Sequence, residues 1–227
     1  MVGAMLSSAI STLSASPLNI TNIDGSWVNG NPAASITALS NVASPGTDSV
    51  RWGGTLGDLT SGSGYDLAPA ADLIPVTLNS AFALGTFTHR NQPIGFSITD
   101  IAYAFQFDTN GVPANFSDSF DFDHNETPNS TGTSPADDDI VTISSVNLNG
   151  LINVGLDTFF FNLLGFSADG GVTISDVFSS PEGGNNSVVL YGIVTDQPLN
   201  GVPEPGTLGL LLTGVLGLAV FRKKGSC

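Results

Sequence analysis

The stretch Ile101-Ala102-Tyr103-Ala104-Phe105-Gln106-Phe107-Asp108 decides the fold class. Its large apolar side chains occupy every second position, so they share one face of an extended chain, while small and polar side chains share the other face. This alternation is typical of a β-strand that is buried on one side. The stretch therefore predicts a half-buried strand that contributes aromatic rings to a core.

The same period of two recurs on both sides of that strand. Phe116, Phe120 and Phe122 alternate with Ser117, Ser119, Asp121 and Asp123, and the period returns at Val188, Leu190 and Val194. Further strands are expected within residues 20–27, 76–88, 140–148, 156–166 and 172–178. Turn sequences include Thr109-Asn110-Gly111 and Asp169-Gly170-Gly171, and residues 55–64 and 127–135 are expected to be loops. The sequence predicts an all-β fold, an antiparallel β-sandwich over residues 17–198 with a jelly roll as one option, followed by a single hydrophobic helix near the C-terminus.

Charge and cysteine content exclude several classes of protein. The 227 residues include 20 Asp and Glu but only 5 Lys and Arg, and before residue 222 the only cations are Arg51 and Arg90. So acidic a body repels polyanions, which excludes a nucleic-acid partner. The single cysteine, Cys227, excludes a disulfide scaffold and a zinc site built from several cysteines.

The C-terminal region predicts a membrane segment. Residues 206–221 carry no charge and are followed by Arg222, Lys223 and Lys224. As a helix, this segment spans about 24 Å, slightly less than a hydrocarbon core of about 30 Å. We expect a transmembrane helix at 206–221 with a basic cytoplasmic tail at 222–227, which leaves the preceding domain on the extracytoplasmic side. A buried core helix is the alternative.

A short extended linker is expected at residues 199–205. It contains Val202, Pro203, Glu204 and Pro205, and its prolines lack the N–H groups that a helix or sheet requires. This motif, the apolar segment and the basic cluster, in that order, resemble the PEP-CTERM sorting signal of Gram-negative bacteria. The resemblance implies passage through the inner membrane and recognition by an exosortase, a membrane-embedded cysteine peptidase or transpeptidase. The tail would then be removed and the domain delivered to the cell surface or the extracellular matrix, with extracellular polysaccharide as a further partner.

Residues 1–16 resemble a weak signal peptide. A mildly apolar stretch precedes the small residues Ser14, Ala15 and Ser16, but a basic n-region is missing. We interpret the segment as a truncated signal peptide, and a disordered leader is the alternative.

The string Thr88-His89-Arg90-Asn91 is the most distinctive in the body of the chain. It resembles the signature, Thr88, His89 and Asn91, of the THxN family of PEP-CTERM proteins, which implies no known activity. Other segments similar to that family are Gly25-Ser26-Trp27, Val50-Arg51-Trp52-Gly53, Ser63-Gly64-Tyr65, Glu126-Thr127-Pro128-Asn129, Asp138-Asp139-Ile140-Val141, Pro181-Glu182-Gly183 and Asn186-Ser187. Taken by itself, His89 is interpreted as a hydrogen-bonded structural residue in preference to a titrating switch. The pair His89 and His124 lacks the sequence spacing of metal ligands.

The cation Arg51 is expected to form a structural ion pair with a carboxylate. Its neighbour Trp52 offers a ring on which a cation could stack. Binding of a ligand by Arg51 is the alternative.

An acidic cluster suggests a calcium site. Asp121, Asp123 and Asn125 occupy every second position and supply carboxylate and amide oxygens, as the ligands of calcium-binding loops do. Asp138 and Asp139 on a neighbouring loop could complete the ligand shell. The segment is not an EF-hand, because Glu126 and Gly132 stand where that motif requires Gly and a bidentate Glu. Solvated acidic turns are the alternative, and no other cofactor is predicted.

These observations predict an exported, non-enzymatic surface or matrix protein. The first alternative is a calcium-assisted glycan-binding or adhesion module in which exposed Trp27, Trp52 or Tyr65 stack on sugars. The second alternative, a glycoside hydrolase, requires two facing carboxylates in a cleft. A Gly-x-Ser-x-Gly nucleophile motif is absent from the sequence.

Overall fold

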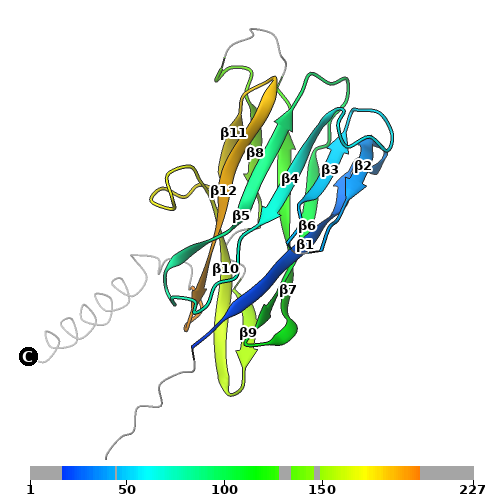
Figure 1. Ribbon diagram of the computed structural model, residues 1–227. Coiled ribbons are helices and arrows are strands. Elements are labelled where there is room, and N and C mark those ends of the chain that lie inside the picture. Colours follow the sequence, from blue (N-terminus) through cyan, green and yellow to red (C-terminus); the bar gives the residue numbers. More distant parts are fainter. Residues whose placement is uncertain (1–16, 44, 128–133, 146–148, 200–227) are drawn as a thin grey trace, which may run out of the picture.

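A computed structural model describes residues 17–43, 45–127, 134–145 and 149–199. These residues form twelve strands and one short 3₁₀ helix, η1, at Ala33–Ser35 (Figure 1). The strands are β1 (Ile20–Asn31), β2 (Ile36–Ser40), β3 (Asp48–Trp52), β4 (Ser63–Pro69), β5 (Ala81–Asn91), β6 (Asp100–Thr109), β7 (Val112–Asn125), β8 (Asp139–Ile143), β9 (Gly150–Val154), β10 (Asp157–Ser167), β11 (Val177–Ser180) and β12 (Gly184–Thr195).

Two antiparallel sheets pack face to face. The first has the strand order β1-β6-β7-β8-β11, and the second has the order β2-β3-β4-β5-β12-β10-β9. The β11–β12 connection passes from the first sheet to the second, as do several others. The predicted antiparallel β-sandwich is therefore confirmed.

The stretch that decided the fold class is the centre of the first sheet. β6 and β7 form a hairpin in which Tyr103 lies opposite Phe120 and Phe107 lies opposite Phe116. The two turn residues Asn110 and Gly111 have φ angles of 47° and 78°, the left-handed conformation that a tight hairpin turn requires. The turn thus sets a register in which the aromatic side chains of both strands point inward.

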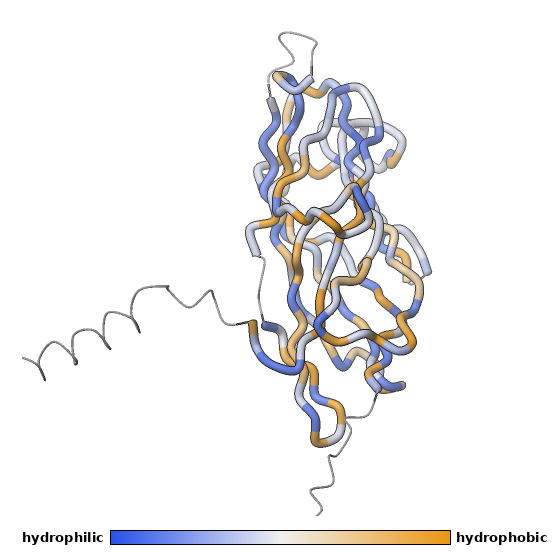
Figure 2. Tube along the Cα trace, turned by 90° about the vertical axis from the view of Figure 1, so that its left-hand side faces the viewer, coloured by the Kyte–Doolittle hydropathy of each residue, from blue (hydrophilic) through white to orange (hydrophobic). Residues whose placement is uncertain are grey.

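The core is aromatic and joins the two sheets. Phe87 of β5 stacks on Phe122 of β7 with ring centroids 5.5 Å apart, and Phe161 of β10 lies 4.9 Å from Phe116 of β7. Figure 2 shows hydrophobic and hydrophilic residues alternating along the strands. This alternation leaves the hydrophilic positions of β7, such as Asp121 and Asp123, exposed on the outer face of the sheet.

Four strands were not expected from the sequence: β2, β3, β4 and β9. The hydrophobic pattern does not predict β3, because the charged residue Arg51 is buried within it. It does not predict β4, because that strand begins with Ser63 and Gly64, inside the loop expected at 55–64. The strand expected at 76–88 runs from Ala81 to Asn91. The expected signal peptide at 1–16 and the expected helix at 206–221 lie outside the described residues. Within the described ranges, the chain has no helix with the length and apolar character needed to span a bilayer.

The two ends of the sandwich differ in what they hold. Leu18 and Thr195 lie at one end, where the amide of Val76 donates to the Leu18 carbonyl and that of Asn79 donates to the Val194 carbonyl. β5 and β12 run antiparallel, so the pairing of Asn91 with Gly184 lies at the opposite end. Figure 1 shows β1 starting and β12 finishing at the lower end of the molecule. Residue 199, after which the predicted sorting region begins, therefore lies far from His89.

Candidate functional site

His89 is buried between the sheets at the end remote from residue 199. It lies on β5, where the alternation that buries Phe87 also turns His89 inward, and its exposed fraction is 0 %. Its Nδ1 forms a 2.8 Å hydrogen bond with Ser180 Oγ at the end of β11, and the Asn186 side-chain amide donates to the same hydroxyl. Within the part of the chain that the structure describes, its Nε2 has no hydrogen-bond partner. One ring nitrogen is thus fixed by the protein and the other is available.

His124 lies beside His89, with ring centroids 5.2 Å apart. The two residues come from facing sheets, His89 from β5 and His124 from β7. The 34 intervening positions made them a poor metal pair in the sequence, and the structure corrects that view because the fold brings both rings into one cluster. His124 Nδ1 is 2.7 Å from the Tyr65 hydroxyl. His124 Nε2 is 3.3 Å from Glu126 Oε2 and 4.0 Å from Asp139 Oδ2.

Three carboxylates complete the cluster. Asp139 is the first residue of β8 and is fully buried, whereas Glu126 and Glu182 are half-buried. One ligand atom from each of His89, His124 and Asp139 lies within 4.8 Å of the others, and the same limit holds for Glu126, Asp139 and Glu182. Asp139 Oδ1 accepts a 2.9 Å hydrogen bond from the Thr127 amide, while its Oδ2 has no hydrogen-bond partner in the described ranges. The two groups share Asp139, which makes them one site.

The surroundings shift two pKa values in this cluster. Burial, followed by the proximity of His124, lowers the pKa of His89 well below its usual value, so its ring is neutral. Burial is also the main reason why the pKa of Asp139 rises to about 6, and repulsion from Glu126 adds to it. Both shifts disfavour charge on the isolated groups. The cluster consequently combines the neutral imidazole of His89 with the carboxyl group of Asp139, whose charged form is disfavoured by burial.

Of the two other residues in the Thr88-His89-Arg90-Asn91 string that were singled out, only Asn91 supports this site from β5. Thr88 points to the opposite face of the strand, where its hydroxyl bonds to that of Ser187 at 2.8 Å. Asn91 is buried, and its amide donates to the Ser180 carbonyl at 2.9 Å. Asn91 therefore holds the same β11 end that fixes His89.

The residues expected to bind calcium do not converge on one site. Asp121, Asp123 and Asn125 are exposed on the outer face of β7, whereas Asp139 points into the core with His124. Asp138 is buried beside the Ser134 and Ser179 hydroxyls, which donate to its Oδ2 at 3.0 and 2.7 Å. The alternation of β7 explains the division, because it turns odd-numbered residues outward and even-numbered residues inward.

The aromatic residues considered for glycan stacking are not on the surface. Trp27, Trp52 and Tyr65 have exposed fractions of 1 %, 0 % and 0 %. The Trp27 indole donates to the Asp48 carbonyl, and Trp52 packs edge-on against both Tyr65 and His124. The expectation of exposed rings is therefore wrong, because all three rings form the core beneath the histidine cluster.

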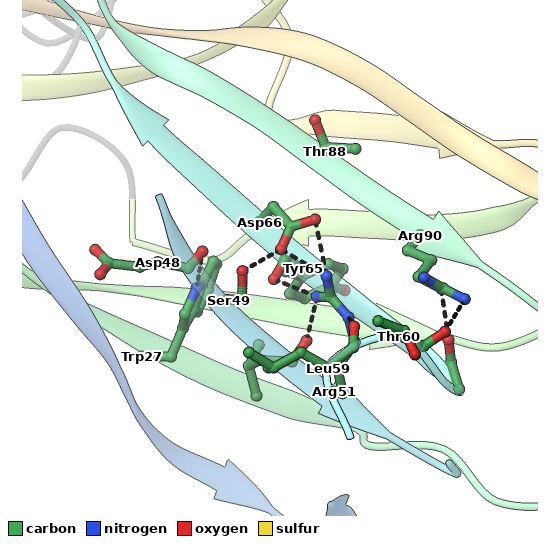
Figure 3. A network of polar contacts seen from close by, with 12 residues as sticks. Trp27, Asp48, Ser49, Arg51, Leu59, Thr60, Tyr65, Asp66, Thr88 and Arg90 are labelled. Atoms are coloured by element: carbon green, nitrogen blue, oxygen red, sulfur yellow. Dashed lines mark hydrogen bonds and ion pairs between the residues drawn. The ribbon is translucent and has the colours of Figure 1, made fainter. Parts of the chain in front are cut away.

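The expected ion pair of Arg51 is confirmed. Its Nη2 donates to both oxygens of Asp66, at 2.8 and 3.0 Å (Figure 3), and Asp66 lies diagonally across the β3–β4 ladder, where it pairs with Ser49. The remaining guanidinium hydrogens bind the carbonyls of Leu59, Val50 and Tyr65. The side chain lies over Gly64, where a Cβ would be 2.6 Å from Arg51 Cδ. Arg51 is thus a structural cation, committed to its own sheet.

The predicted sorting residues lie outside the described part of the chain, which ends at Leu199. They are Val202, Pro203, Glu204, Pro205, Arg222, Lys223 and Lys224. Comparison with known proteins bears on them directly. No curated protein matches the chain. Residues 201–224 match the family described as the PEP-CTERM protein-sorting motif. This match supports the prediction that the chain is a PEP-CTERM exosortase substrate, and it implies export and anchoring at the membrane before release.

Proposed function

We propose that this protein is a non-enzymatic component of the cell surface or extracellular matrix, sorted by an exosortase in the membrane of a Gram-negative bacterium. The observation that carries the proposal is the PEP-CTERM motif at residues 201–224, which begins two residues after the last described residue of the sandwich. The sandwich is the cargo, and the motif is the part that the sorting enzyme reads.

The chemistry of the motif suits this role. Pro203 and Pro205 lack N–H donors, so the sequence around Glu204 is poorly suited to pairing as a β-strand. The uncharged segment at 206–221, as a helix, would span most of a hydrocarbon core, and the three cations that follow would stay on the cytoplasmic side. Cleavage next to the motif would release the acidic domain without its hydrophobic segment.

The geometry of the sandwich is compatible with tethering at one end. β12 finishes at the end where β1 starts, and the histidine cluster lies at the other end. During export, the cluster would therefore face away from the bilayer. The charge of the domain also favours dispersal, because before residue 202 only Arg51 and Arg90 oppose its carboxylates.

The test replaces Pro203, Glu204 and Pro205 together by alanine in a host that contains an exosortase. We expect the wild-type protein to lose the mass of its C-terminal tail and to leave the membrane fraction. The triple variant should keep its tail and remain in the membrane. Pro198→Ala is the matched control, because it removes a proline just before the motif and should be processed normally. Intact mass spectrometry and fractionation measure both properties. Normal processing of the triple variant would refute the proposal.

A further inference from the structure

We infer that the buried cluster of His89, His124 and Asp139, with Glu126 and Glu182 at its rim, binds a divalent first-row transition-metal ion. Zn²⁺ is the ion best suited to its ligands. The ion would join the two sheets at the end of the sandwich remote from residue 199. This inference concerns the folded domain and does not depend on how the chain is sorted.

The first step concerns the available nitrogen of His89. A buried imidazole ordinarily satisfies both ring nitrogens, because a buried polar atom without a partner costs about 1–3 kcal/mol. Ser180 holds Nδ1, yet among the described residues Nε2 has no hydrogen-bond partner, in a side chain of 0 % exposure. Metal-binding histidines have this arrangement: one nitrogen is fixed by a hydrogen bond and the other carries the free electron pair.

The second step shows the same arrangement at His124. The Tyr65 hydroxyl holds Nδ1 at 2.7 Å, which turns Nε2 toward Glu126 and Asp139. Tyr65 itself is fixed by packing against Trp52, with ring centroids 4.8 Å apart. Both imidazoles are therefore oriented by residues behind them, so that their second nitrogens point into one cluster with the carboxylates.

The third step concerns charge. Asp139 and Glu126 bring two carboxylates to one partly buried place beside His124 Nε2, and two such anions favour a bound cation. The sequence offers only two arginines before residue 222. Arg51 is bound to Asp66, and Arg90 donates to the Thr60 and Gly62 carbonyls. Neither arginine neutralises the cluster, and a divalent ion would do so.

The ligand types select the class of ion. Calcium and magnesium take oxygen ligands almost exclusively, whereas two imidazoles with carboxylates are typical of zinc and its neighbours in the first transition row. Tetrahedral zinc with bonds of about 2.0–2.1 Å places its ligand atoms about 3.3 Å apart. The atoms of His89, His124 and Asp139 lie within 4.8 Å of one another, so small side-chain movements would bring them to this distance.

The topology tells what the ion would do. His89 belongs to one sheet, His124 and Asp139 belong to the other, and Glu182 lies on the β11–β12 connection between them. A bound ion would therefore cross-link the two sheets beside the β11–β12 connection. Because the ion binds the folded state alone, it should raise the melting temperature by roughly 8–16 °C at a concentration a thousandfold above Kd.

The test begins with the full chain, purified in mild detergent and treated with a chelator. Elemental analysis gives its metal content before and after equilibration with Zn²⁺, and thermal melts record the stabilisation. We expect one Zn²⁺ per chain and a melting temperature that rises with Zn²⁺ concentration but not with Ca²⁺. X-ray absorption at the zinc edge should show nitrogen and oxygen ligands only.

Variants locate the ion. His89→Gln and Asp139→Asn should abolish the stabilisation by Zn²⁺. Glu126→Gln changes a half-buried rim residue, so it should fold even if the core variants do not, and it should weaken Zn²⁺ binding by about 10–100-fold. Asp123→Asn is the matched control, because it removes a carboxylate next to His124 on the outer face of β7. It should bind Zn²⁺ like the wild type.

Two results would overturn the inference. The first is a wild-type chain that takes up no stoichiometric Zn²⁺, Mn²⁺, Co²⁺ or Ni²⁺ and whose melting temperature none of them changes. The second is Zn²⁺ binding that Glu126→Gln and every folded core variant retain at full affinity, which would place the ion elsewhere.

Discussion

Replacement of Arg51 by methionine should destabilise the sandwich by about 3 kcal/mol. The side chain is 7 % exposed, and its hydrogen bonds reach Asp66 and three backbone carbonyls. Breaking a buried ion pair by removing one partner costs about 3–5 kcal/mol. The lower end applies because Asp66 is 25 % exposed and keeps the hydrogen bond from the Ser49 hydroxyl. Methionine fills the space over Gly64, so the loss would report polar contacts and not a cavity.

The assay is urea unfolding of the full chain, followed by the fluorescence of the buried Trp27 and Trp52. For a chain of this size, 3 kcal/mol corresponds to a melting temperature lower by roughly 6–12 °C. Arg90→Met is the control: that side chain is half-exposed and bonds only to carbonyls, so its loss should cost less than about 1 kcal/mol. Equal effects of the two variants would refute the reasoning, because they would show that burial and the carboxylate partner do not matter.

Two further predictions concern the histidine cluster and an exposed turn. Tyr65→Phe removes the hydroxyl that fixes His124 Nδ1, so it should destabilise the metal-free protein by about 1–3 kcal/mol. It should also weaken Zn²⁺ binding by about 10–100-fold. Urea unfolding and Zn²⁺ titration measure the two effects, and wild-type results in both would contradict the prediction. The Thr173 amide, followed by the Ser167 hydroxyl, lowers the pKa of Asp169 to about 2. Because the folded-state value lies below the unfolded one, the stabilisation is complete above about pH 4 and is lost as the pH falls toward 2. An NMR titration of the Asp169 carboxyl should give a pKa of about 2 in the wild type. Asp169→Asn should remove the loss of stability that this carboxyl causes in acid. A pKa near 4 would contradict the prediction, because the turn would then not stabilise the carboxylate.

The fold class was predictable because the period of two is local. β6 carries it from Ile101 to Phe107, β7 carries it except at Asp118, and Asn110 and Gly111 supply the turn between them. β3 and β4 were not predictable in this way, because Arg51 breaks the apolar pattern. Its burial becomes favourable only when Asp66 and the carbonyls of the neighbouring strand are in place. A pattern of hydrophobicity contains no information about such partners, so it does not predict β3 and β4 as strands of the second sheet.

The histidine cluster was missed for a different reason, and the signal for it was present in the sequence. Its members are separated by up to 93 positions, from His89 to Glu182, so no spacing rule for metal ligands applies. Their phase within each strand was nevertheless visible. His89 follows Phe87 by two positions, and His124 follows Phe122 by two, so both continue the inward face of an aromatic strand. Asp139 likewise precedes Val141 by two positions in β8. A titratable residue in the apolar phase of a strand must be buried, and a buried titratable residue must be paired. Three such residues in one sandwich predict a common partner, even when the sequence alone does not show that their strands meet at the same end.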